Sequence, residues 1–117
     1  MERENAIRKK SFLFSVKVVT LYKFLVSTKK EFVMSKQLLR SGTAIGALVR
    51  EAEQAESRAD FIHKLSIALK EANETEYWLD LLKATEYLNQ EQYEESQKDI
   101  KEILKLLIAI VKKMKQK

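Results

Sequence analysis

The sequence contains no proline and no cysteine, and it has only two glycines in 117 residues. At average usage, a chain of this length would hold about six prolines and about eight glycines. These residues form the tight turns of hairpins, so their scarcity argues against sandwiches, barrels and α/β folds with many loops. The lack of cysteine excludes disulfides, thiolate nucleophiles and cysteine-based zinc sites. What remains favours a few long helices joined by short connections.

Long uncharged apolar runs are also missing. Lys17 and Lys23 interrupt the apolar stretch near the N-terminus, and the run over residues 103–111 is far shorter than the roughly 20 residues that a bilayer requires. We therefore expect a cytoplasmic protein with no membrane partner. The length fits one domain, residues 1–117, with a single core of ordinary size.

Three helix-start signals divide the chain, each with a polar cap followed three residues later by an acid or amide. They are Thr28 to Glu31, Ser57 to Asp60 and Asn89 to Gln92. The helices that these signals imply cover residues 5–27, 29–56, 58–88 and 90–116. Short connections favour antiparallel neighbours, so the prediction is an all-α, antiparallel up-down-up-down four-helix bundle.

The third predicted helix has the clearest apolar period, with steps of four and three residues. Its stripe consists of Phe61, Leu65, Ala68, Ala72, Thr75, Leu79 and Leu82. The first segment is wider, because Phe12 to Val18 alternates as a strand would. A lone strand would lack a partner for its hydrogen bonds, so we interpret it as a helix. Its width indicates one face for its own core and one for a neighbouring chain, or a helix deep in its own bundle.

Both glycines, Gly42 and Gly46, fall inside the second predicted helix, four residues apart. Each costs about 1 kcal/mol relative to alanine in a helix interior. With Ala44 and Ala47 they form a thin strip, which predicts a helix-packing seam where another helix approaches closely. The alternative is a local break at Ser41 and Gly42.

Positive charge is concentrated at the two ends of the chain, whose formal net charge is +5. Residues 1–30 carry +6 and 100–117 carry +5, whereas 51–99 carry −8. An up-down bundle brings both termini to one end, together with the acids Glu51, Glu53, Glu56 and Asp60. The candidate nucleic-acid-binding residues there are Arg3, Arg8, Lys9, Lys10, Lys112, Lys113, Lys115 and Lys117. No base-reading motif accompanies them.

The candidates for catalysis or metal binding are weak. Asp60 and His63 share a helical face, but one histidine cannot complete a di-iron site within a protomer. Glu71 and Glu74 also share a face, and we expect them to pair with Arg40 or Arg50 rather than to do acid–base work. We expect no enzyme activity and no cofactor.

The aromatic pair Tyr77 and Trp78 lies beside the core stripe of the third predicted helix. Exposed, the two rings would stack on bases; buried, they would fill the bundle or a subunit interface, which we prefer.

Two stretches, Glu31 to Ala52 and Asp60 to Leu82, resemble the four-helix-bundle proteins first recognised as products of intervening sequences inside bacterial 23S rRNA genes. Ala44 stands where relatives often carry serine, and Leu48 where they often carry asparagine. The resemblance implies a left-handed antiparallel bundle and assembly into rings of five copies. The genomic setting of relatives, and a similarly shaped basic accessory protein of diversity-generating retroelements, suggest association with RNA or ribosomes.

Two functions stay open. One is a non-enzymatic homo-oligomer, a pentamer by resemblance, that associates with RNA or another nucleic acid. It would assemble through the first helix and the Tyr77–Trp78 region. The alternative is a protein-interaction or assembly module with no nucleic-acid ligand. A carboxylate enzyme or metal site is a distant third.

Overall fold

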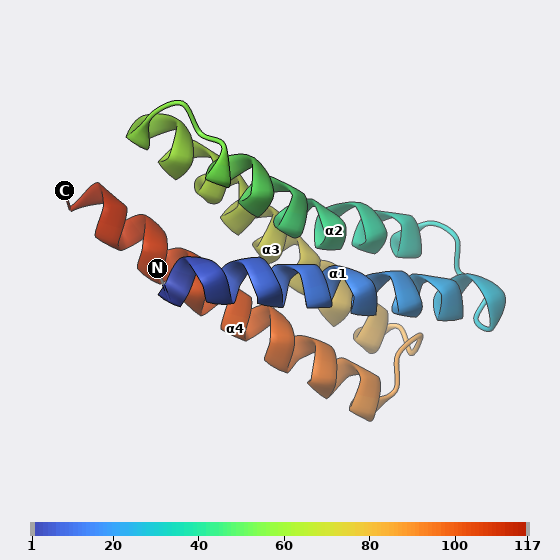
Figure 1. Cartoon of the computed structure of the whole chain (residues 1–117). Helices are drawn as coiled ribbons and strands as arrows, with labels where there is room; N and C mark the ends of the chain where they lie inside the picture. The colour runs from blue at the N-terminus through green and yellow to red at the C-terminus, as the bar shows by residue number, and fades with distance from the viewer. Residues whose placement is uncertain (1, 117) are drawn as a thin grey trace.

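The computed structural model describes residues 2–116, and in that range the regular structure is entirely helical. The helices are α1 (Glu2–Ser27), α2 (Met34–Glu53), α3 (Arg58–Ala84) and α4 (Gln90–Lys115). Figure 1 shows consecutive helices running in opposite directions, so the order is up-down-up-down. Each helix packs against two neighbours: α1 against α2 and α4, and α3 against α2 and α4. The predicted all-α four-helix bundle is confirmed, and it is elongated, measuring 47 × 21 × 19 Å.

The core lies along the axis of the bundle and receives side chains from all four helices. On α3 the predicted stripe is buried from Leu65 to Leu82, with Phe61 half-buried at its start. The first segment is a helix and not a strand, and it buries Ile7, Phe14, Val18 and Leu25. Leu21 and Phe24 of this helix also pack against the core, whereas four other apolar side chains stay exposed and matter for the site described below: Phe12, Leu13, Val16 and Val19.

Two of the three predicted helix starts form in the structure. At α4 the Asn89 side chain accepts from the backbone N–H of Gln92, and the Gln92 side chain accepts from that of Asn89, completing a capping box. At α3 the Ser57 hydroxyl accepts from the backbone N–H of Asp60 at 3.0 Å. The carboxylate of Asp60 accepts in turn from the N–H of Glu56.

The predicted start at Thr28 is wrong, because α2 begins at Met34 rather than near residue 29. The backbone N–H of Thr28 still bonds to the carbonyl of Phe24, so α1 is only just ending there. The chain then reverses through Lys30, whose φ of 55° lies in the left-handed region.

Glu31 supplies the cap of α2 that Thr28 was expected to supply. Its buried carboxylate accepts from the backbone N–H groups of Val33, Met34 and Ser35, the last at 2.7 Å. One carboxylate thus satisfies three of the free N–H groups of a helix start, more than a hydroxyl can.

Two helix ends also come earlier than predicted. α2 ends at Glu53 rather than residue 56, and α3 ends at Ala84 rather than 88. Beyond α3, Glu86 adopts a φ of 67°, which reverses the chain toward α4.

The glycines of α2 face α1. A Cβ on Gly42 would lie 2.8 Å from Val18 Cγ2, and one on Gly46 would lie 3.3 Å from the backbone oxygen of Ser11. The helix is continuous through Ser41 and Gly42. The missing side chains therefore allow α1 to approach α2 closely at both positions.

Candidate nucleic-acid interface

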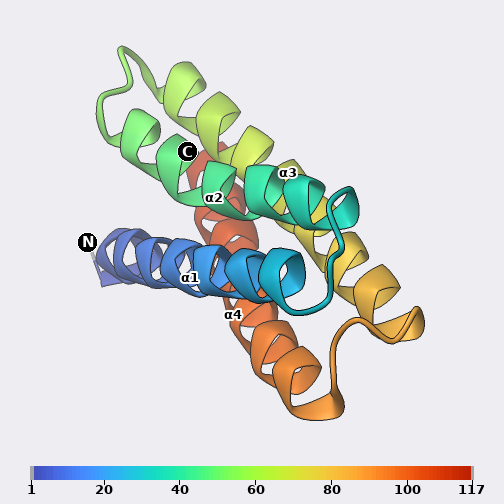
Figure 2. The same ribbon diagram turned by 90° about the vertical axis from the view of Figure 1, so that its right-hand side faces the viewer.

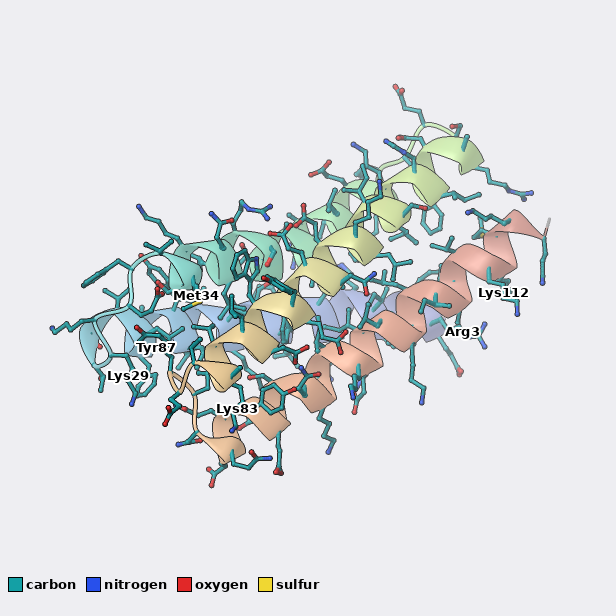
Figure 3. All side chains as sticks on the ribbon, turned by 180° about the vertical axis from the view of Figure 1, so that it is seen from behind. Arg3, Lys29, Met34, Lys83, Tyr87 and Lys112 are labelled. Atoms are coloured by element: carbon teal, nitrogen blue, oxygen red, sulfur yellow. The ribbon has the colours of Figure 1, made fainter. Side chains whose placement is uncertain are left out.

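The candidate basic residues gather at the end of the bundle that carries both termini. Figure 3 labels Arg3 of α1 and Lys112 of α4 at this end, with Lys29 at the opposite end. Within residues 2–116, five of the eight candidates are exposed and form no ion pair: Arg3, Lys9, Lys112, Lys113 and Lys115. Lys117 lies outside the described residues. These side chains are available to an anionic ligand.

The other two candidates are held by acids of neighbouring helices. Arg8 Nε lies 3.1 Å from Glu53 Oε2 of α2, and Lys10 Nζ lies 2.9 Å from Glu102 Oε2 of α4. The hydrogen bond from Lys10 lowers the pKa of the Glu102 carboxyl. The α1 side of this end is therefore less positive than its residue count suggests.

A second ion pair fastens α1 to α4 further along the bundle. Lys17 Nζ lies 2.7 Å from Asp99 Oδ2 and 3.3 Å from Glu95 Oε1. The hydrogen bond to Asp99 raises the pKa of the Lys17 ammonium. The acids of α4 that face α1, Glu95, Asp99 and Glu102, are thus all matched by lysines of α1.

The candidate set omitted three lysines of α4, because it followed runs of basic residues at the chain ends. Lys98, Lys101 and Lys105 are exposed and continue toward Lys112 and Lys115 at steps of 3, 4, 7 and 3 residues. We call these five residues the α4 lysine stripe. Helical spacing places them on one edge of α4. That spacing is the sequence signal that could have identified them.

The two glutamates of α3 that were considered for catalysis both form ion pairs with one arginine of α2. Arg40 of α2 contacts both: its Nη1 lies 3.2 Å from Glu71 Oε1, and its Nη2 contacts the Glu74 carboxylate. Glu74 also accepts from the indole N–H of Trp78 at 3.0 Å. The partner of the two glutamates is therefore Arg40 and not Arg50, a choice that the sequence alone left open.

The aromatic pair of α3 is divided between core and solvent. Trp78 packs against the hydrophobic core, whereas Tyr77 is 56% exposed and meets it edge-on, with ring centroids 5.1 Å apart. Within a single chain the predicted preference for burial thus holds in part for the tryptophan, which is half-buried, and not for the tyrosine.

The width of the apolar surface of α1 has a structural explanation. Phe12, Leu13 and Val16 are each about half exposed, at 53, 49 and 49%. Val19 extends the patch, and together we call these four residues the α1 apolar face. In Figure 2, α1 and α4 cross at an angle. An apolar groove of about 380 Å³ lies between the two helices and reaches Val16 and Phe24. Large apolar side chains exposed together indicate a contact surface.

Metal binding and membrane crossing find no support among residues 2–116. No cluster of three or more His, Asp or Glu side chains with metal-binding geometry is present in this range, and His63 is exposed. None of the described helices is long and apolar enough to cross a bilayer.

Comparison with known proteins places this geometry in a family. The family model described as 23S rRNA-intervening sequence protein matches residues 3–109. The chain is similar to the crystal structure of a protein with unknown function from the S23 ribosomal protein family of Bacteroides thetaiotaomicron. The two are 66% identical, the TM-score is 0.93, and the match covers 94% of this chain and 98% of that one. No curated protein matches the chain.

Proposed function

Because the chain belongs to the family of 23S rRNA-intervening sequence proteins, we propose that it is a non-enzymatic, self-associating protein that binds RNA or another nucleic acid through its basic helix termini. The observation that carries the proposal is the group of exposed, unpaired cations where α1 begins and α4 ends. Lysine side chains bind phosphates as point charges, without reading sequence.

Assembly strengthens weak phosphate contacts. The α1 apolar face offers a second copy a surface that one chain leaves in water, and we propose that copies associate there, with Tyr77 of α3 as the second contact region. Each added copy repeats the basic end, and joined binding sites raise overall affinity without any new contact. A ring of five copies, as the resemblance implies, would carry the strongest field.

A binding titration tests the proposal directly. Labelled RNA is titrated with the protein at about 50 mM salt, where phosphate contacts are least screened. Replacing Lys112, Lys113, Lys115 and Lys117 with glutamine should weaken binding several-fold at this low salt concentration while the bundle stays folded. The matched control replaces Lys23, Lys29, Lys30 and Lys36, exposed lysines in and near the turn at the opposite end, and should bind as the unmodified protein does.

The outcomes separate the candidate functions. No binding to RNA or duplex DNA at low salt would remove the nucleic-acid proposal. It would leave the second candidate, a protein-interaction or assembly module, which the α1 apolar face favours. Equal losses in both lysine variants would show dependence on net charge rather than on the basic end. Measuring the mass of the assembly with and without RNA tests binding and self-association in one experiment.

A further inference from the structure

The surface of α4 divides into three sectors of different chemistry. One sector is the core, with Ile100, Ile103 and Leu107. A second faces α1 and holds the acids that Lys10 and Lys17 neutralise. The third faces solvent and carries the α4 lysine stripe; it borders the side of α3, where Gln97 and Tyr93 donate to Asp80. At 100° per residue the acidic and basic sectors are centred roughly a third of a turn apart.

The acids and the lysines of the two charged sectors differ in their ion pairing in the folded protein. All three acids facing α1 have a lysine within ion-pair distance, whereas none of the five stripe lysines pairs with an acid among the described residues. Asp80, a carboxylate of α3 on this side, accepts from the Tyr93 hydroxyl at 2.7 Å and from the Gln97 amide at 2.6 Å. Folding therefore pairs each acid that faces α1 with a lysine of α1 and leaves the stripe lysines without an ion-pair partner among the described residues, although Lys98 and Lys105 still act electrostatically on Glu102.

We propose that the α4 lysine stripe is the track along which this protein holds the phosphate backbone of a nucleic-acid duplex. The inference rests on the proposed function and moves its main contact from the helix termini to one edge of α4. From Lys98 to Lys115 the stripe is about 26 Å long at 1.5 Å per residue. A duplex carries one phosphate per about 1.7 Å of axis, so roughly fifteen phosphates of the two strands lie within that length, and those on the facing side are the ones that the lysines would contact.

The chemistry of the stripe favours a duplex over a single strand. Single-strand sites combine positive charge with aromatic side chains that stack on bases, and the stripe contains no aromatic residue. The helix that carries it contains no arginine or asparagine, two of the side chains that read base edges in pairs of hydrogen bonds, and Gln116 lies beside Lys112 and Lys115 at its end. Ile108, half exposed in the gap between Lys105 and Lys112, adds only apolar contact. Recognition would therefore follow charge density, which is highest on a duplex.

Salt dependence of binding is the measurement that tests the stripe. The K98Q/K101Q/K105Q variant removes three lysines unique to the stripe, and R3Q/K9Q/K113Q removes three unpaired cations that lie off it. Both variants have three fewer positive charges, and glutamine preserves helix propensity. Affinity for a short RNA duplex, a DNA duplex and a single strand of equal length is measured from 50 to 200 mM salt, with circular dichroism confirming the fold.

The stripe variant should bind duplexes more weakly, and the slope of log affinity against log salt should fall by about 2.7, or 0.9 for each phosphate that a lysine no longer neutralises. When the salt concentration rises from 50 to 200 mM, the affinity of the stripe variant should therefore fall by a factor roughly fortyfold smaller than the factor by which the affinity of the unmodified protein falls. The slope of the off-stripe variant should fall by less than one unit.

Other results overturn the proposal in distinguishable ways. Equal losses in both variants would reduce the effect to net charge, and a larger loss in R3Q/K9Q/K113Q would return the contact to the helix termini. Either would leave the proposed function standing. Tighter binding of the unmodified protein to the single strand would overturn the duplex assignment. Failure of the unmodified protein to bind any nucleic acid at 50 mM salt would refute the proposed function, and the stripe with it.

Discussion

Gly42 of α2 lies directly against Val18 of α1, so that a Cβ added at Gly42 would be 2.8 Å and 2.9 Å from the two γ carbons of that valine. Val18 is buried and β-branched, with little freedom to move aside. The G42A variant gains about 1 kcal/mol of helix propensity but meets overpacking that costs about 1–3 kcal/mol. We expect it to unfold at lower urea concentration, by about 1 kcal/mol in free energy.

In a V18A background, the effect of G42A on the free energy of unfolding should have the opposite sign. In a V18A background the obstructing γ carbons are gone, so adding G42A should stabilise the protein relative to V18A alone. Urea denaturation of the four proteins gives the double-mutant cycle. If G42A has the same effect in both backgrounds, the close approach of α1 and α2 at this point does not explain the glycine.

Glu31 should make stability depend on pH in a defined window. Burial raises the pKa of its carboxyl, but hydrogen bonds from the backbone N–H groups of Ser35, Met34 and Val33 outweigh this, so the pKa lies below its usual value. A lowered pKa means that the stabilisation is complete above the unfolded value, about 4.3, and is lost as pH falls through the folded value. E31Q should therefore cost about 1 kcal/mol near neutral pH, in the range of a removed helix cap, and less in acid.

The control for Glu31 is Glu86, an exposed acid at the other chain reversal. Urea unfolding of E31Q, E86Q and the unmodified protein between pH 3 and 7 should show a pH-dependent gap for E31Q alone. A gap for E31Q that stays constant across this range would mean that the carboxylate charge plays no part in capping α2.

Features that depend on residues close together in the sequence were predicted better than features that depend on how two helices align. The α3 stripe and the Asn89 cap depend on residues within one or two turns, and both are observed as predicted. The predicted cap at Thr28 was wrong because Glu31 was a second candidate for the cap of the same helix, and its carboxylate satisfies more N–H groups than a hydroxyl does. The choice of Arg40 as the partner of Glu71 and Glu74 required the register between α2 and α3, which no local pattern specifies.

The candidate site was harder to predict for the same reason. Whether Lys10 is paired with Glu102 depends on how α1 and α4 align, and the sequence shows only that both residues carry a charge. The lysines at 98, 101 and 105 were detectable from their helical spacing, but their importance follows from the absence of any acid paired with them among the described residues of the folded bundle. Charge counts along the chain cannot separate side chains that form ion pairs from those that do not.

Trp78 reports on the ion pair beside it, because it is the only tryptophan of the chain. Hydrogen bonds from Trp78 and then Arg40 lower the pKa of the Glu74 carboxyl, since both favour its charged form. In R40Q the midpoint of the acid transition in tryptophan fluorescence should move to higher pH, while stability changes by at most about 1 kcal/mol, as expected for an exposed pair. K36Q, which removes an exposed lysine on the same helix, should leave the midpoint unchanged; an identical shift would assign the effect to net charge.

The α1 apolar face should control the mass of the protein in solution. Leu13 and Val16 each leave about half of their surface in water, and a carboxylate in a buried contact would have to be desolvated without a partner. L13E/V16E should therefore sediment as a monomer at micromolar concentration, where the unmodified protein is expected to be larger. Val33 is more exposed, at 73%, but lies outside this face, so V33E should sediment as the unmodified protein does. A monomeric unmodified protein would contradict self-association, and an L13E/V16E variant that keeps the full mass would show that copies join through another surface.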